Sequence, residues 1–281
     1  MDFDSDIWFT AFRNAAYSIE ASLAKLSNRV DREHVLGFGK GGDPTLVVDD
    51  IAERAVLEEL KKLHLAGHDF VVISEELGKK SFGSSQIHVI VDPIDGSANA
   101  KRGIPFYSLS VAVALGDRMG EVVLGYVKDF GSGEEWTAVR GAGARLNGLP
   151  LVGEGPREHV EVLALESTRM DIFVEYAEAL APFADRVRIM GSCALSLCHF
   201  AAGRFDAMCT LRPIRCVDIA AAQLLASERL LPIHLTDGCA LSDVPFDLDY
   251  RSRVVAAAGS KECDELVQAL QDVVSNELFY S

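Results

Sequence analysis

The sequence predicts an α+β protein built in two halves, and two observations predict this fold class. In the first half, two amphipathic helical stretches are followed by strand candidates and Gly-rich turns, which is typical of helices packed on a largely antiparallel sheet. After Pro150, strand and helix candidates alternate, as they do in layered α/β structures. We therefore expect an N-terminal half at residues 1–149 and a C-terminal half at 150–281 that form one unit.

The helices of the first half are predicted from apolar spacing and from acidic residues near their starts. The first runs from about Trp8 to Leu26, with Asp6 as its cap. The second runs from about Asp49 to Leu63. Asp49 and its acidic neighbour stand in the first turn, where carboxylates favour the helix dipole and cap free N–H groups, so capping alone would explain them.

A Gly-rich loop at 34–44 carries Lys40 between these two helices. The loop lacks the G-x-x-x-x-G-K-[ST] spacing of a phosphate-binding loop and follows no obvious strand. We expect it to be a mobile segment near an anionic site, and a plain linker is the alternative interpretation.

The remaining elements follow from β-branched runs, alternation and helical spacing. In the first half we expect strands at 70–73, 87–91, 106–115, 121–128 and 134–140, and a turn cluster at 141–148. In the second half we expect strands at 161–165, 186–190, 205–211 and 253–257, and helices at 171–180, from the cap Ser192 to 202, at 218–230 and at 261–274.

Composition and charge limit the classes of protein. The chain has 281 residues, of which 49% are hydrophobic and 25% are charged, as in ordinary globular proteins. A net charge of −15 argues against a nucleic-acid-binding surface, which needs a basic footprint. The same charge suits a protein that binds divalent cations, and an anionic substrate would need such cations to offset the repulsion.

The cysteines and the N-terminus predict a cytoplasmic protein with reduced thiols. No C-x-x-C pair or zinc spacing occurs, so we interpret the cysteines as small buried apolar residues. The first residues are acidic and lack a signal pattern, and no apolar run approaches the length of a membrane span. The six cysteines, all in the C-terminal third, are Cys193, Cys198, Cys209, Cys216, Cys239 and Cys263.

The most informative stretch is residues 88–99, H-V-I-V-D-P-I-D-G-S-A-N. Its β-branched run predicts a buried strand that ends at the Pro and Gly in a tight turn. Asp92 and Asp95 can then converge on one point and hold a hard cation, since Mg²⁺ prefers oxygen ligands. Gly96 lets the backbone approach a ligand closely and Ser97 adds a hydroxyl, whereas an ordinary surface turn is the alternative.

Acidic residues at the end of a second strand favour the metal interpretation. The strand at 70–73 leads through a serine into Glu75 and Glu76. Adjacent strands that both present acids at their ends can build one site. Asp218 opens an apolar helix candidate, where it can serve as an N-terminal acid or point into a site between the two halves.

Four motifs occur together in a characteristic order: D-x-x-A-E at 49–53, S-E-E at 74–76, D-P-I-D-G-S at 92–97 and V-D-I-A-A-A at 217–222. In this combination the chain resembles the inositol monophosphatase superfamily of Mg²⁺-dependent, Li⁺-sensitive sugar-phosphate phosphatases. G-A-R-L-N-G at 143–148 and S-R-V-V-A-A at 252–257 fit the same pattern. The run at 99–110 and the G-G-D-P-T-L entry before Asp49 look most like the archaeal-type inositol monophosphatase/fructose-1,6-bisphosphatase branch.

The resemblance implies a layered αβαβα sandwich, usually a homodimer, that uses two or three Mg²⁺ ions. Glu75, Asp92 and the backbone carbonyl of Ile94 would hold the first ion. Asp92, Asp95 and Asp218 would hold the second. The C-terminal half would thus supply Asp218 and the substrate pocket to the metal and phosphate motifs of the N-terminal half, in one catalytic unit.

The resemblance also implies catalytic and phosphate-binding roles. Gly96 and Ser97 would offer backbone N–H groups to the phosphate. Ser97 and Asp49 would orient and deprotonate the attacking water, and Glu75 would count among the catalytic residues as well as the metal ligands. The loop around Lys40 would be the mobile segment near a third, more weakly held ion.

Departures from the family pattern bear on the substrate. The inositol-selective branch carries a Glu seven residues before the aspartate that matches Asp218, and here that position is Leu211, followed by Arg212. Arg212 and Arg215 could meet the second phosphate of a bisphosphate, since a guanidinium binds phosphate bidentately, or they could be surface arginines. Cys193 falls where family members line the sugar pocket.

The resemblance therefore implies a phosphomonoester hydrolase that acts on inositol monophosphate, fructose 1,6-bisphosphate or both, by attack of metal-activated water. Alternatives are a nucleotide phosphatase for 3′-phosphoadenosine phosphate or NADP, and a non-catalytic metal- or phosphate-binding protein. A covalent route through Asp95 is a further alternative, although metal would occupy its lone pairs. The expected partners are a small phosphorylated sugar or polyol and a second copy of the chain, with no nucleic acid and no membrane.

Overall fold

The computed structural model describes residues 4–26, 29–38, 44–83, 86–157, 159–166 and 169–280. Lys40 and the centre of the Gly-rich loop lie outside the described residues. The main helices are α1 (Ser5–Leu23), α3 (Val47–Leu65), α5 (Met170–Leu180), α6 (Cys193–Ala201), α7 (Ala222–Glu228) and α8 (Ser260–Tyr280). Shorter elements are α2 (Arg29–Glu33), α4 (Ser97–Arg102), a two-stranded ribbon of β1 (Val35–Phe38) and β2 (Pro44–Leu46), and a 3₁₀ turn at Cys216–Asp218.

The larger sheet is almost entirely antiparallel. Its strands are β3 (Phe70–Ser74), β4 (Gly78–Phe82), β5 (Ile87–Asp95), β6 (Ser108–Leu115), β7 (Val122–Asp129), β8 (Glu135–Val139), β9 (Gly143–Leu146) and β10 (Leu149–Pro150). Their spatial order is β10-β9-β8-β7-β6-β5-β3-β4. Among the described strands of this sheet, only β3 and β5 pair in parallel, and this pair ends where the acidic motifs lie.

The smaller sheet is mixed. It contains β11 (Val162–Glu166), β12 (Arg186–Arg188), β13 (Ala207–Thr210), β14 (Ile233–Leu235) and β15 (Val254–Ala257) in the order β12-β11-β13-β15-β14. The β11 strand pairs in parallel with β12 and β13, whereas β15 pairs antiparallel with β13 and β14.

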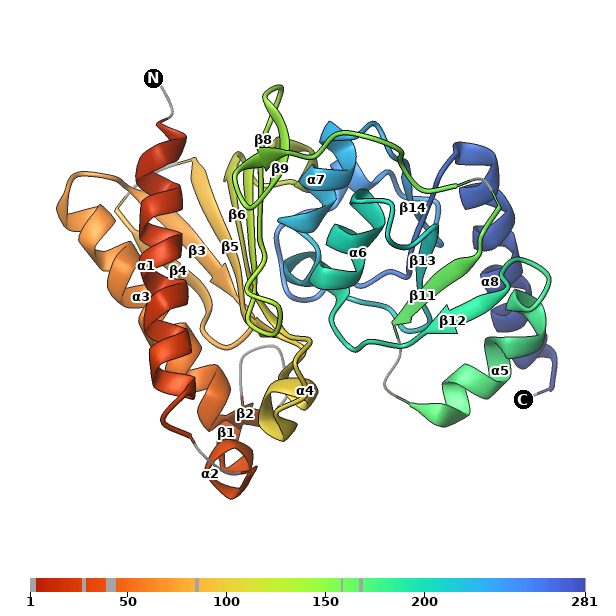
Figure 1. Ribbon diagram of the computed structural model, residues 1–281, viewed down its shortest axis with the longest axis horizontal. Helices are drawn as coiled ribbons and strands as arrows, with labels where there is room; N and C mark the ends of the chain where they lie inside the picture. Colours follow the sequence, from red (N-terminus) through yellow and green to blue (C-terminus); the bar gives the residue numbers. More distant parts are fainter. Residues whose placement is uncertain are drawn as a thin grey trace.

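The helices and sheets alternate across the molecule (Figure 1). The helices α1 and α3 cover one face of the larger sheet, α6 and α7 lie between the two sheets, and α5 and α8 cover the far face of the smaller sheet. The αβαβα sandwich predicted from the sequence is confirmed. No helix in the described part of the chain is both long and apolar enough to span a bilayer.

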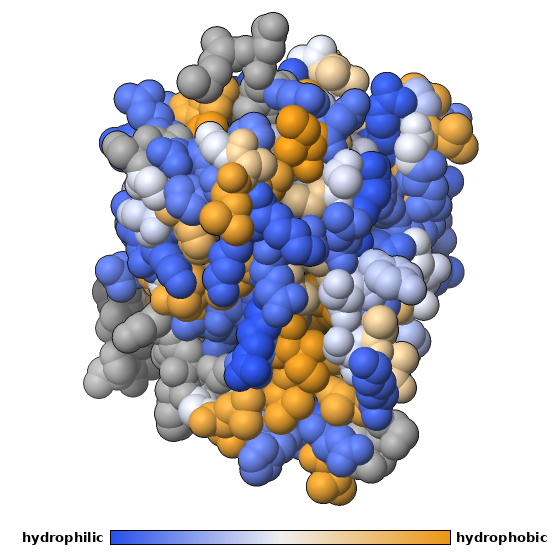
Figure 2. Space-filling view, turned by 90° about the vertical axis from the view of Figure 1, so that its left-hand side faces the viewer, coloured by the Kyte–Doolittle hydropathy of each residue, from blue (hydrophilic) through white to orange (hydrophobic). Residues whose placement is uncertain are grey.

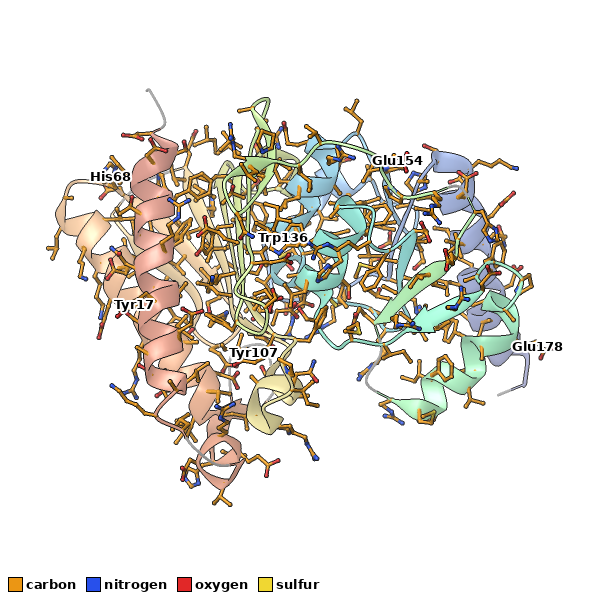
Figure 3. All side chains as sticks on the ribbon, in the orientation of Figure 1. Tyr17, His68, Tyr107, Trp136, Glu154 and Glu178 are labelled. Carbon is orange, nitrogen blue, oxygen red and sulfur yellow. The ribbon has the colours of Figure 1, made fainter. Side chains whose placement is uncertain are left out.

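Because helices cover both faces of the larger sheet, its central strands are buried on both sides. In β6, Leu109 and Val111 pack toward α1 and α3, whereas Ala112 and Ala114 belong to the core shared with α6 and α7. Trp136 of β8 is fully buried in that shared core, between the sheet and α6 (Figure 3). The outer face of the molecule on the α1 and α3 side is largely hydrophilic, with apolar areas among the polar ones (Figure 2).

Several element boundaries differ from the sequence predictions for local reasons. The cap of α1 is Asp4, whose side chain accepts the Asp6 N–H at 3.0 Å, so Asp6 lies in the first turn instead. The β5 strand does not end at Val91 but continues to Asp95, because its last residues still pair with β6 across an irregularity.

Two polar strands were not predicted. The segment G-K-K-S-F forms β4 at the edge of the larger sheet, where its central residues are exposed and need no apolar alternation. The expected turn cluster at 141–148 contains β9, which pairs with β8.

The helix expected at 218–230 is wrong in its start. Asp218 ends a 3₁₀ turn, and α7 begins at Ala222.

Candidate metal centre

The parallel pairing of β3 and β5 brings the acidic ends of the two strands together. Ser74 is aligned with Val91, so the residues that follow, Glu75 and Asp92, lie side by side at one edge of the sheet. This adjacency follows from the chain direction, since parallel strands end at the same edge.

Asp218 joins these two acids from the 3₁₀ turn that precedes α7. One carboxylate oxygen from each of Glu75, Asp92 and Asp218 lies within 4.8 Å of the others. Asp92 is 3% exposed, and burial followed by the charges of Glu75, Asp95 and Asp218 raises its pKa well above the usual range of a carboxyl. A set of buried, mutually repelling oxygen donors is what a hard divalent cation stabilises, so these residues fit Mg²⁺.

Arg215 lies within the same group. Its guanidinium forms an ion pair with Glu75, and its Nε is 3.8 Å from Asp218 Oδ1. Its backbone N–H donates to Asp218 Oδ2 at 2.8 Å, which closes the 3₁₀ turn. The residue is only 8% exposed, so of the two interpretations of Arg215 the surface arginine is wrong.

Asp95 faces the N-terminus of α6. Its Oδ2 accepts the Ser192 hydroxyl and the Ala194 N–H at 2.7 Å, and its Oδ1 accepts the Cys193 N–H at 3.3 Å. Burial raises the pKa of Asp95 to about 7. Asp95 lines the same cleft as the three other acids, but it is not part of their close group, so its expected role as a ligand of a second ion stays a prediction.

Asp49 and Ser97 are brought together beside this cleft, although they are distant in sequence. The Ser97 Oγ lies 2.9 Å from Asp49 Oδ1 and 2.9 Å from the carbonyl oxygen of Ile94, and its single hydrogen can be donated to one of them at a time. Asp49 Oδ2 also accepts the Leu46 N–H at 2.9 Å, which is the capping role expected for this residue. Burial is the largest cause of the raised pKa of Asp49.

Gly96 lies where backbone segments approach one another closely at the cleft. Its φ is +93°, and an added Cβ would lie 3.0 Å from the carbonyl oxygen of Gly191 and 3.1 Å from that of Phe106. Both the left-handed conformation and the lack of space favour glycine here.

The cleft has a volume of about 330 Å³ and is open to solvent. Cys193 and Arg212, expected to contact substrate, both line it, whereas Leu211 is fully buried in the core beneath α5 and α8. The lining residues are Glu75, Asp92, Ile94, Asp95, Gly96, Ser97, Ala98, Glu166, Gly191, Cys193, Arg212, Pro213, Ile214, Arg215, Asp218 and Arg251.

The charged lining residues Glu166 and Arg251 were missed in the sequence. Glu166 is 6% exposed and accepts the Ser196 hydroxyl and the Gly191 N–H, the latter at 3.0 Å. Burial raises the pKa of Glu166 to about 8. The signal that pointed to Glu75, an acid at the end of a β-branched or apolar strand, is also present in V-L-A-L-E at 162–166.

A second group of potential ligands among the described residues is explained by structural interactions. Asp129, Glu134 and His199 each bring a ligand atom within 4.8 Å of the others. Glu134 is paired with Arg204 at 2.7 Å, and Asp129 accepts the Gly131 N–H at 2.7 Å in a turn. The cysteines are free thiols; four are buried as expected, Cys193 is partly buried and Cys239 is exposed.

The layered fold and the acidic cleft between its sheets define a metal-dependent phosphomonoesterase. The model of the inositol monophosphatase family matches residues 5–275, and the chain belongs to this family. The chain is 34% identical over 248 residues to a fructose-1,6-bisphosphatase/inositol-1-monophosphatase of Archaeoglobus fulgidus, with 87% of this chain and 91% of that one covered.

Further relatives agree with this assignment. A protein of the same description from Methanothermobacter thermautotrophicus is 30% identical over 286 residues, covering 95% of this chain and 99% of its own. A crystal structure described as an inositol monophosphatase–fructose 1,6 bisphosphatase superposes with a TM-score of 0.81 at 29% identity, covering 93% of this chain and 99% of that one.

Proposed function

We propose that the protein is a Mg²⁺-dependent phosphatase of inositol monophosphate and fructose 1,6-bisphosphate. Glu75, Asp92 and Asp218 would hold the divalent ions, together with Asp95 and the carbonyl of Ile94. When bound, the ions neutralise the charge of the phosphate ester and activate water for attack on phosphorus. The observation that carries the proposal is the contact between Ser97 and Asp49, since Ser97 lines the same cleft as this oxygen-donor group.

The Ser97–Asp49 pair supplies a route for the proton of the attacking water. Ser97 can accept a hydrogen bond from water while it donates its own hydrogen to Asp49 at 2.9 Å. Burial raises the pKa of Asp49, which makes this carboxylate a stronger base than an exposed aspartate. In this proposal Asp49 takes the proton, and the backbone N–H groups of Gly96 and Ser97 orient the phosphate.

The residues around the substrate end of the cleft favour a bisphosphate as well as an inositol phosphate. Leu211 stands where the inositol-selective branch has an acidic side chain, and it is buried in the apolar core, so it cannot bind sugar hydroxyls. Arg212 is exposed and lines the cleft, where its guanidinium can meet a second phosphate.

The test is phosphate release from inositol 1-phosphate, fructose 1,6-bisphosphate and 3′-phosphoadenosine 5′-phosphate, each with and without Mg²⁺. Wild type should turn over the first two substrates only with Mg²⁺, and Asp95→Asn should lose this turnover. Arg212→Gln should raise KM for the bisphosphate about 10- to 100-fold, as expected for loss of a hydrogen bond to a charged group, and leave KM for inositol 1-phosphate unchanged. Arg145→Gln, on an exposed arginine outside the cleft, is the control.

Other outcomes would select an alternative function. Preference for the nucleotide would indicate a nucleotide phosphatase. Mg²⁺ binding without turnover of any of the three substrates would favour a non-catalytic binding protein. A homodimer, Li⁺ inhibition and a cytoplasmic location belong to the same proposal; sedimentation, inhibition by LiCl and cell fractionation test them.

A further inference from the structure

We propose that Arg215 is an internal cation that competes with Mg²⁺ for the carboxylate group of Glu75, Asp92 and Asp218, and thereby sets the affinity of the protein for metal. The inference rests on the proposed metal centre. It concerns how tightly that centre binds ions, which can be measured without any turnover of substrate.

The geometry places the guanidinium among the predicted ligands. Arg215 contacts Glu75 through Nη2, and its Nε lies 3.8 Å from Asp218 Oδ1. Glu75 and Asp218 belong to the group whose oxygens lie within 4.8 Å of one another, and the charge of Arg215 also acts on the third member, Asp92. An ion that takes oxygen donors from these acids therefore draws on the same carboxylates that the guanidinium contacts.

The electrostatics of a buried site make this competition strong. Three carboxylates close together in a poorly solvated environment repel one another, and one guanidinium offsets part of that repulsion. A guanidinium stays protonated at any physiological pH, so the competition is present throughout the pH range of an enzyme assay. A divalent ion carries more charge than the guanidinium, but its favourable binding free energy is reduced because it displaces contacts of Arg215.

The backbone allows such a displacement. The N–H of Arg215 is fixed by its 2.8 Å hydrogen bond to Asp218 Oδ2, so the main chain of the 3₁₀ turn can stay in place while the side chain turns. Arg215 also lines the cleft of about 330 Å³, which gives the displaced guanidinium room beside the substrate-binding region.

The experiment is calorimetric titration of Mg²⁺ into metal-free wild type, Arg215→Met and Arg212→Met, with thermal unfolding of each protein with and without Mg²⁺. Arg215→Met should bind Mg²⁺ about 5- to 150-fold more tightly, the range typical of coupling between two binding events. It should also lower Tm in the absence of metal and enlarge the rise in Tm that Mg²⁺ causes. Arg212→Met is the matched control, because it removes an exposed guanidinium from the same cleft and should leave the Mg²⁺ affinity, the metal-free Tm and the Mg²⁺-induced rise in Tm unchanged.

Arg215→Lys provides a second variant if the methionine variant does not fold without metal. It keeps the charge but loses the planar fork, so it should bind Mg²⁺ more tightly than wild type and less tightly than Arg215→Met. If Arg215→Met cannot be measured, the expected result is tighter Mg²⁺ binding by Arg215→Lys than by wild type. Unchanged or weaker Mg²⁺ binding by the Arg215 variants would overturn the inference, and so would an equal tightening by Arg212→Met. If the Arg215 variants bind Mg²⁺ more tightly but wild type turns over no phosphate ester, the inference about Arg215 stands and the proposed phosphatase is refuted.

Discussion

Glu166 should make the stability of the metal-free protein depend on pH. Its carboxyl is 6% exposed, and burial raises its pKa to about 8 from a usual value of 4.5. The folded state therefore holds a proton at pH values at which the unfolded state has released it. The stabilising effect is fully present below pH 4.5 and is lost as the pH rises toward about 8.

The magnitude follows from the interval between these two pKa values. Each pH unit corresponds to about 1.4 kcal/mol for one proton, so the free energy of unfolding should fall by at most about 5 kcal/mol across the interval from 4.5 to about 8. Glu166→Gln has no titrating group and keeps a polar side chain for the Ser196 hydroxyl and the Gly191 N–H. The unfolding free energy of wild type minus that of Glu166→Gln should therefore decrease as the pH rises.

The assay is urea unfolding of both proteins in EDTA at a series of pH values from 5 to 9. A difference between wild type and Glu166→Gln that does not change with pH would refute the reasoning. The control is Glu178→Gln, which removes an exposed carboxylate on α5 at the surface of the molecule (Figure 3). That substitution should change the unfolding free energy by less than about 0.5 kcal/mol at every pH, as expected for a surface site.

Further substitutions test the site and the packing. Asp92→Asn should raise the Tm of the metal-free protein, because it removes a carboxyl whose charged form is opposed by burial and by the neighbouring acids, and should abolish both the Mg²⁺-induced rise in Tm and the turnover. Asp49→Asn should lower kcat by about 10²- to 10⁴-fold, as for loss of a general base, while calorimetry still detects Mg²⁺ binding. Gly125→Ala should destabilise the fold by about 1–3 kcal/mol in urea unfolding, because the new Cβ would lie 2.5 Å from the Ala221 carbonyl oxygen. Gly155→Ala, where the nearest atom is 3.8 Å away, should change stability by less than about 0.5 kcal/mol.

The sequence predicts the elements whose pattern is dictated by burial. The α3 helix and the central strand β6 have apolar residues at the spacing their surroundings require, and both are found within a few residues of the expected limits. The strands β4 and β9 escaped prediction because they lie at or near the ends of the larger sheet, where hydrogen bonding to neighbouring strands specifies a strand without an apolar pattern.

The site was predictable to the extent that each residue belongs to a local motif. Asp92 and Asp95 share one strand end, and Glu75 follows the neighbouring strand, so their proximity depends only on the pairing of β3 with β5. The ion pair between Arg215 and Glu75 joins residues 140 positions apart, on elements whose relative placement depends on the packing of whole layers. No local pattern encodes such a contact.

The junction between the larger sheet and α6 runs directly through the cleft. The N–H groups of Cys193 and Ala194 are held by Asp95, and the side-chain amide of Asn99 donates to the carbonyl oxygens of Phe106 and Met190, at 2.8 and 2.7 Å. A small separation of the two layers would release these amides to exchange with solvent deuterium long before either sheet unfolds. The exchange rates at the start of α6 therefore report how often the cleft opens, and any ligand that engages both layers would act as a clamp that slows them.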